Sequence, residues 1–160
     1  MKKSDLILVG VVIAIVVLAM FSSKGTKALD EVEYPLTLAG EVGLHQITYN
    51  EYKTMVDNGD AFIVVIERDG CSYCTMYMPI VEEVAKEKKF PLYFIDIADL
   101  SSEEMNKLET TNDYLRKNSS KWGTPTTLFM LGDRVLDSIG GYVEKDTVLA
   151  LLKDKVVMGE

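Results

Sequence analysis

Cysteine and histidine are scarce in this sequence, which has two cysteines and one histidine. A closed zinc site takes four ligands, so this content argues against one, and no other cofactor is expected. The single histidine, His45, stands in a different segment from the cysteines, and nothing near it suggests a catalytic triad. We therefore interpret His45 as a half-buried strand residue.

Positive charge is also scarce. The chain has 17 basic and 25 acidic side chains, and residues 28–160 alone have 13 and 24, which gives them a net charge of −11. A surface this negative repels nucleic acid and anionic lipid headgroups. There is no basic patch or interleaved aromatic platform, so no nucleic-acid partner is expected.

One long apolar run, Leu6 to Phe21, follows two lysines at the amino terminus. At about 1.5 Å per residue it falls slightly short of the roughly 30 Å hydrocarbon core, but the flanking serines extend it enough to span a bilayer. We expect residues 1–27 to form a membrane anchor. A cleaved signal sequence is the alternative, although the run is long for one and no A-x-A-like site follows. No cysteine lies near the run, which excludes a lipoprotein anchor.

The lysines on the two sides of this run are nearly balanced, so they indicate little about its orientation. A thiol pair tethered to a membrane is most useful facing an oxidising compartment, where disulfides are made, broken or sorted. We therefore expect a single-pass protein of the cell membrane with an extracytoplasmic domain over residues 41–160, secreted if the amino terminus is cleaved. Residues 28–40, with their charges and Pro35, are predicted to form a polar linker.

Strands and helices alternate along the predicted domain. The first half is predicted to contain a strand at 44–47, a helix capped by Thr48 and Glu51 and ended by Asn58-Gly59, a strand at 62–66, and a helix to about 89. The second half is predicted to contain a strand at 92–97, one or two helices over 101–118, strands at 126–131 and 134–139, and a closing helix over 142–156. Gly132-Asp133 would join the last two strands, and Gly140-Gly141 would end or bulge the second of them. The strand at 62–66 is apolar on both faces, which is typical of a central strand covered by helices. This order indicates an α/β fold.

Both cysteines lie in Cys71-Ser72-Tyr73-Cys74, between the central strand and the helix that follows it. A sulfur at a helix start lies among unpaired backbone N–H groups at the positive end of the helix dipole, so it ionises easily and becomes a nucleophile. Cys74 lies about one turn further along the same face, close enough to attack a disulfide formed at Cys71. A purely structural disulfide is the alternative, but it would close a very short loop and gain little chain entropy.

Four features occur in register along the chain: the cysteine pair after the central strand, Pro79 in the helix, Thr124-Pro125-Thr126 before the hairpin, and the hairpin itself. Together they resemble the thioredoxin family over nearly everything after residue 40. Within that family the chain is most similar to membrane-anchored bacterial thiol-disulfide oxidoreductases, including a group of bacteriocin transport accessory proteins. The implied fold is a mixed central sheet flanked by helices.

The resemblance implies a role for each residue of the site. Cys71 would be the attacking thiolate and Cys74 the resolving thiol, while Thr124 and a cis Pro125 would form the loop whose backbone docks an extended substrate segment. Ser72 and Tyr73, between the cysteines, would contact the substrate. Trp122 belongs either to the substrate groove or to the core, and the same choice applies to Tyr73 and Tyr77.

The sequence also departs from thioredoxins. Where they carry Trp before the first cysteine, Gly-Pro between the two and a buried Asp on the strand, this chain has Gly70, Ser72-Tyr73 and Val65. An acidic neighbour such as Glu67, or water, would then have to deprotonate Cys74.

We expect thiol-disulfide exchange with cysteine-containing secreted or membrane proteins, and a redox partner that recycles the pair. The alternative is a non-enzymatic binding module for a membrane transporter or a secreted peptide, as in bacteriocin export, with the disulfide left permanently oxidised.

Overall fold

The computed structural model describes residues 32–158 of the chain. The strands of this part are β1 (Gly43–Gln46), β2 (Ala61–Glu67), β3 (Pro91–Asp96), β4 (Thr126–Leu131) and β5 (Arg134–Gly140). Its helices are α2 (Tyr49–Asn58), α3 (Ser72–Glu87), α4 (Ser102–Thr111), α5 (Asp113–Lys117) and α6 (Lys145–Leu152). The order therefore follows the predicted alternation, with the stretch after β3 divided into two helices.

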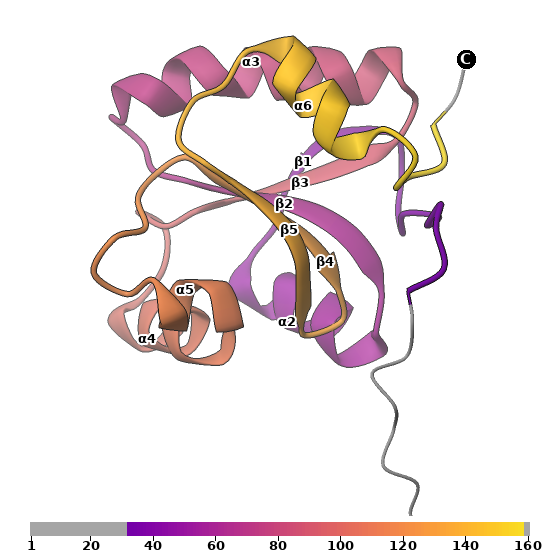
Figure 1. Ribbon diagram of the computed structural model, residues 1–160. Helices are drawn as coiled ribbons and strands as arrows, with labels where there is room; N and C mark the ends of the chain where they lie inside the picture. The colour runs from indigo at the N-terminus through magenta and orange to yellow at the C-terminus, as the bar shows by residue number, and fades with distance from the viewer. Residues whose placement is uncertain (1–31, 159–160) are drawn as a thin grey trace, which may run out of the picture. The chain divides into compact units, whose positions relative to one another are not determined.

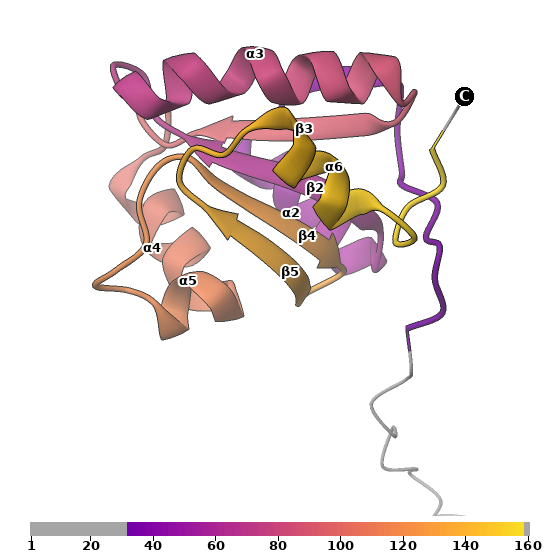
Figure 2. The same ribbon diagram turned by 45° about the horizontal axis from the view of Figure 1, so that its top comes forward.

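The strands form one mixed sheet in the order β1-β3-β2-β4-β5, so β2 lies in the middle (Figure 1). β1, β3 and β2 are parallel, whereas β4 pairs antiparallel with β2 and β5 antiparallel with β4 (Figure 2). Phe62 to Ile66 are at most 1 % exposed, which confirms the prediction of a central strand covered on both faces. The carboxyl ends of β2 and β3 therefore lie together at one edge of the sheet.

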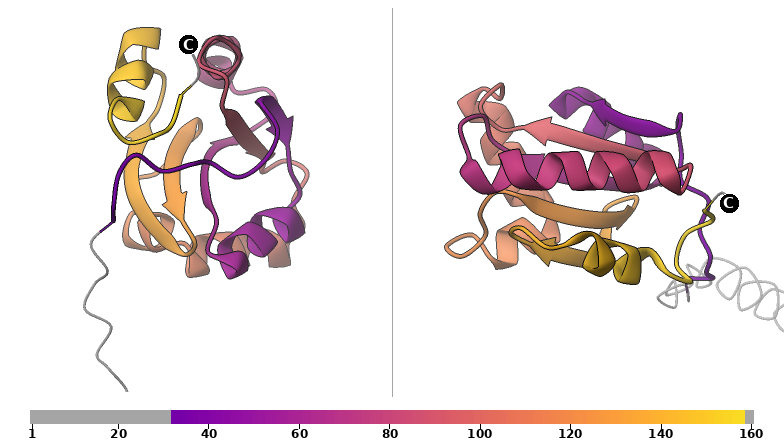
Figure 3. Two further views of the ribbon diagram at one scale, coloured as in Figure 1. Left: turned by 90° about the vertical axis from the view of Figure 1, so that its right-hand side faces the viewer. Right: turned by 90° about the horizontal axis from the view of Figure 1, so that it is seen from above.

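Helices cover both faces of the sheet (Figures 1 and 3). α3 and α6 lie on one face, where Val65, Tyr77 and Phe129 belong to one apolar cluster. α2, α4 and α5 lie on the other, where Ile66, Leu108 and Leu115 belong to a second cluster. The alternation of β2 side chains between the two clusters follows from the two-residue period of a strand.

The predicted helix ends are confirmed at the first helix. Thr48 accepts a hydrogen bond from the Glu51 backbone while the Glu51 carboxylate accepts one from the Thr48 backbone, which is a capping box. At the other end Gly59 adopts φ 76°, a left-handed stop that other residues rarely take. α4 begins with the same device, made by Ser101 and Glu104, and the side chain of Asn112 caps α5.

The closing helix is shorter than the sequence predicts at both ends. Residues 142–156 were expected to be helical, but α6 covers only Lys145–Leu152. Beyond it, Val156 is buried and forms an isolated parallel bridge with Leu36. Val156 follows Leu149 and Leu152 at helical spacing, and this spacing led to the prediction of a longer helix. In the structure Val156 is buried because it pairs with an extended segment that is distant in sequence.

That partner segment lies within residues 28–40, which the sequence predicts to form a polar linker. Part of residues 28–40 packs against the domain: the Leu36 N–H bonds the Lys155 carbonyl at 2.8 Å, Leu38 is buried, and the Ala39 N–H bonds the Ala61 carbonyl at 2.9 Å. Gly40 closes the segment with φ 113°, and a Cβ there would lie 1.6 Å from the Tyr93 hydroxyl oxygen. Apolar Leu36 and Leu38 among the polar residues explain why this stretch docks.

The membrane anchor predicted over residues 1–27 lies outside the described residues. Within residues 32–158, every helix is too short or too polar to cross a bilayer. His45 lies in the first strand, β1, and is half-buried, as predicted; its Nε2 is 3.0 Å from the Glu41 carbonyl oxygen.

Candidate functional site at the start of α3

Cys71 is the N-cap residue of α3, immediately after the loop that follows β2. Its backbone is extended, with φ −83° and ψ 114°, and its N–H bonds the Arg68 carbonyl at 3.1 Å. An N-cap side chain points back at the free N–H groups of the first helical turn. The sulfur of Cys71 therefore occupies the place that a capping oxygen takes in most helices.

The Cys71 sulfur is hydrogen-bonded to both Cys74 and Thr124. Sγ accepts a hydrogen bond from the Cys74 backbone N–H at 3.2 Å, and the thiol donates to the Thr124 carbonyl oxygen at 3.4 Å. Both cysteines are free thiols. Cys71 is 9 % exposed and Cys74 2 %, so a substrate sulfur can reach Cys71 first.

Hydrogen bonding makes the Cys71 thiol acidic. Burial opposes the charged form, but hydrogen bonds from the Cys74 and Thr124 side chains and from the Cys74 and Tyr73 backbones outweigh it. The pKa of Cys71 therefore lies below the ordinary value of a thiol. This is the state expected of an attacking thiolate.

The second thiol is shifted the opposite way. Burial raises the pKa of Cys74, and the Cys71 side chain raises it further, while the Arg68 backbone and the Thr124 side chain only partly offset these effects. Cys74 therefore keeps its proton where Cys71 loses it. The two pKa shifts assign different chemical states to two sulfurs one helical turn apart.

Thr124 lies beside the cysteine pair, and Pro125 follows it in the segment that leads into β4. The Thr124–Pro125 peptide bond is cis, which confirms the expectation drawn from the resemblance. Pro125 is buried, and its carbonyl accepts a hydrogen bond from the Gly141 N–H at 2.8 Å, while Thr124 stays half-buried beside Cys71. The carbonyl oxygen of Thr124 thus lies next to the Cys71 sulfur.

Two buried hydroxyls lie on the α3 side of the sheet near the cysteines. The Tyr77 and Thr127 hydroxyl oxygens are 2.9 Å apart, and Thr127 is the register partner of Val65.

Glu67, the acidic neighbour considered as a base, has a raised pKa because of its burial and the nearby Asp96, Asp69 and Asp99. Its electrostatic partners are thus other carboxylates.

A groove of about 670 Å³ runs beside Cys71. It is lined by Cys71 and by four of the residues that the sequence analysis assigned to substrate binding, Ser72, Tyr73, Trp122 and Thr124, whereas Pro125 does not line it. Trp122 is half-buried and also packs against the second apolar cluster, so it serves both the groove and the core. Tyr73 is 61 % exposed in the groove, whereas Tyr77 is fully buried.

Sequence reasoning missed several groove residues: Arg68, Ile97, Met105, Glu109 and Ser119. Ile97 could have been found, because it follows β3, the parallel neighbour of β2, and the carboxyl ends of such strands meet. Met105 and Glu109 come from α4, and their place in the groove depends on how that helix packs.

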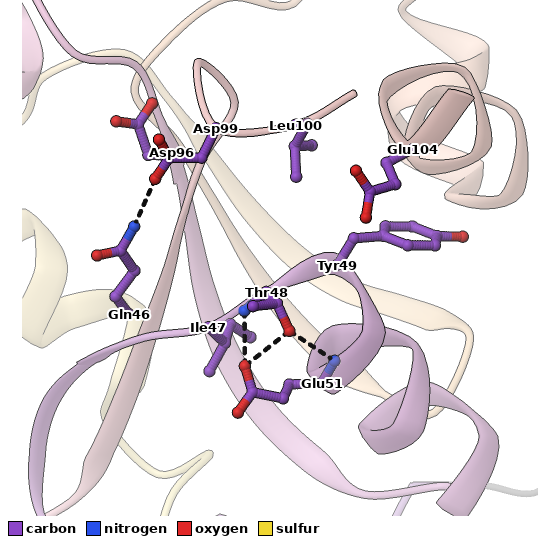
Figure 4. A pocket seen from close by; sticks show the side chains of 9 residues that line it. All are labelled: Gln46, Ile47, Thr48, Tyr49, Glu51, Asp96, Asp99, Leu100 and Glu104. Carbon is purple, nitrogen blue, oxygen red and sulfur yellow. Dashed lines mark hydrogen bonds between the residues drawn. The ribbon is translucent and has the colours of Figure 1, made fainter. Parts of the chain in front are cut away.

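A second cavity, of about 310 Å³, opens between the start of α2 and the start of α4 (Figure 4). Its polar side chains already serve the fold: Glu51 caps α2, Glu104 caps α4, and Gln46 donates to the Asp99 carboxylate at 2.9 Å. Neither cysteine lines it. Within residues 32–158, no three His, Cys, Asp or Glu side chains gather closely enough to hold a metal ion.

Comparison with solved structures relates this arrangement to known proteins, although no family model matches the sequence. The chain is similar to thioredoxin f of spinach chloroplasts, with a TM-score of 0.53 and 15 % identity over 72 % of this chain and 95 % of that one. It is similar to a thioredoxin of Nicotiana alata, with a TM-score of 0.52 and 12 % identity over 73 % and 96 %. A thioredoxin of Malassezia sympodialis gives a TM-score of 0.51 and 14 % identity over 77 % and 95 %. The described domain therefore has a thioredoxin-like α/β fold.

Proposed function

We propose that the protein is a thiol-disulfide oxidoreductase that exchanges disulfides with protein substrates through Cys71 and Cys74. The observation that carries the proposal is the position of the Cys71 sulfur. It caps α3, accepts the Cys74 N–H at 3.2 Å and lies 3.4 Å from the carbonyl of the residue before Pro125. In this proposal Cys71 is the nucleophile, Cys74 is the resolving thiol, and the Thr124 backbone beside them docks the substrate.

The exchange takes place in two steps. The Cys71 thiolate attacks one sulfur of a substrate disulfide, that S–S bond breaks, and the other substrate sulfur leaves as a thiolate. Cys74 then loses its proton to water and attacks the Cys71 sulfur, which releases the substrate as a dithiol and leaves a Cys71–Cys74 disulfide. Two electrons pass from the protein to the substrate. The reverse sequence oxidises a substrate dithiol, and the reduction potential of the pair sets the direction.

The proposed setting is extracytoplasmic. The apolar run from Leu6 to Phe21 would hold the domain at the cell membrane, and its substrates would be cysteine-containing secreted or membrane proteins. A separate redox protein would recycle the pair after each turnover.

Trapping the mixed disulfide tests the assigned roles. Cys74→Ser should accumulate a covalent complex with substrate protein that a reducing agent releases, because the resolving thiol is missing. Cys71→Ser should lose turnover, and the double variant Cys71→Ser/Cys74→Ser is the control for nonspecific capture. Intact turnover in either single variant would contradict the proposal.

A further inference from the structure

We infer that Met105 and Glu109 of α4 determine which substrates enter the groove, and that they select segments with a large apolar residue near the reacting cysteine followed by a basic residue. This inference rests on the proposed exchange function. It concerns the wall of the groove that α4 contributes.

The two residues form one continuous surface. They are four positions apart on α4, so their side chains lie on the same face of the helix, and both line the groove. Met105 is half-buried, and the apolar side chains of Ile97, Trp122 and Tyr73 line the same groove. An apolar side chain of a bound segment would be enclosed here, with Met105 adapting to its shape.

Glu109 lacks a partner, unlike the other acidic residues of α4. Glu103 pairs with Lys107 at 2.6 Å, and Glu104 caps the helix through Ser101. Glu109 is half-buried and makes no hydrogen bond or ion pair with any residue from 32 to 158. A partly desolvated carboxylate without a partner gains most from a cation supplied by a ligand.

The surroundings favour a cation at this wall. Residues 32–158 carry 21 acidic against 13 basic side chains. Asp96, Asp99 and Glu104 lie at the neighbouring corner between β3 and α4 (Figure 4). Their field attracts a basic segment toward α4 and repels an acidic one.

Arg68 fixes the direction of such a segment. Its guanidinium is exposed, lines the same groove, and belongs to the loop that carries Cys71. A basic substrate residue is therefore repelled at the Cys71 end and attracted at the α4 end. A Lys or Arg side chain reaching Glu109 would lay its methylene groups along Met105 and place its charge at the carboxylate.

The test uses the full-length chain and a series of short disulfide peptides. Each peptide carries Leu beside the cysteine and Lys, Gln or Glu at the position beyond it, and the measured quantity is kcat/KM for disulfide exchange. The wild-type protein should prefer the Lys peptide over the Glu peptide by about two- to fivefold, and this preference should shrink as salt is added. Glu109→Gln should abolish the preference and Glu109→Lys should reverse it.

Glu103→Gln is the matched control, because it removes the same charge from the same helix at a residue that does not line the groove. It should keep the wild-type preference. A small aromatic disulfide, which cannot reach α4, should react equally with all of these variants. Equal kcat/KM for the Lys and Glu peptides in the wild-type protein, at low and high salt, would overturn the inference without involving any variant. No exchange with any disulfide would instead refute the proposed function.

Discussion

The hydroxyls of Tyr77 and Thr127 hydrogen-bond each other at 2.9 Å in the interior of the domain. Tyr77 is fully buried, Thr127 is 2 % exposed, and Thr127 pairs with Val65 across the sheet. The polar groups behind the cysteine pair on this face are therefore two neutral hydroxyls that satisfy each other. They hold α3 against β4, the strand that follows Pro125.

Substitutions of Tyr77 and Thr127 should have non-additive effects on the unfolding free energy. Tyr77→Phe and Thr127→Val should each cost about 1–3 kcal/mol of unfolding free energy, because each leaves one buried hydroxyl without a partner. The double variant should cost less than the sum, since it leaves no unpaired group. Denaturant unfolding of the four proteins measures the coupling, and additive losses would show that the two hydroxyls act independently.

The two thiols should titrate separately. Because the pKa of Cys71 is lowered, its thiolate forms at lower pH than in an ordinary thiol, whereas the raised pKa of Cys74 delays ionisation to higher pH. As the pH is raised, the alkylation rate of Cys71 should therefore increase at a lower pH than it does in the unfolded chain. The alkylation rate of Cys74 should increase at a higher pH than it does in the unfolded chain. Mass spectrometry after brief labelling distinguishes the two sites. Coincident profiles for both cysteines would contradict the assignment of nucleophile and resolving thiol.

Removing the Thr124 hydroxyl should raise the pKa of both Cys71 and Cys74. The Thr124 side chain lowers the pKa of Cys71 and of Cys74, so Thr124→Val should move both alkylation profiles to higher pH. Thr75→Val is the matched control, because the Thr75 hydroxyl donates to the Cys71 carbonyl at 3.2 Å rather than to a sulfur. A larger shift in the Thr75 variant than in the Thr124 variant would argue against the assigned role of Thr124.

Gly40 should be essential for docking of the segment before β1. Gly40→Ala places a Cβ against the Tyr93 hydroxyl at φ 113°, and should cost about 1–3 kcal/mol of unfolding free energy. Tyr93→Phe removes the clashing oxygen, so the same substitution should cost less in that background. An equal loss in both backgrounds would mean that backbone strain alone determines the effect.

Local patterns in the sequence were sufficient to predict much of this fold. The start and the end of α2 could be predicted from residues at its own termini, Thr48 with Glu51 and Gly59. The position of Cys71 could be predicted from the strand before it and the helix after it. The end of α6 could not be predicted in this way. Val156 fits a helical period, and only its bridge to Leu36, far away in sequence, shows that it is extended.

Some residues of the site could likewise be predicted from the sequence, whereas others depend on how distant segments pack. The cysteine pair was predicted because thiols at the start of a helix carry the chemistry, and Thr124-Pro125 was predicted from the resemblance to the thioredoxin family. Met105 and Glu109 have ordinary helical residue types, and only the packing of α4 beside the cysteine loop places them in the groove. The Tyr77–Thr127 pair likewise depends on the register between β2 and β4.

The reduction potential of the Cys71–Cys74 pair tests the central claim most directly. The full-length chain is equilibrated in dithiol and disulfide buffers of known potential, and the oxidised fraction is measured from the mass added by alkylation. A cycling pair with a stabilised Cys71 thiolate should have a potential above about −300 mV and interconvert fully. A bridge below about −300 mV that resists reduction would identify a permanent structural disulfide and contradict the proposed exchange.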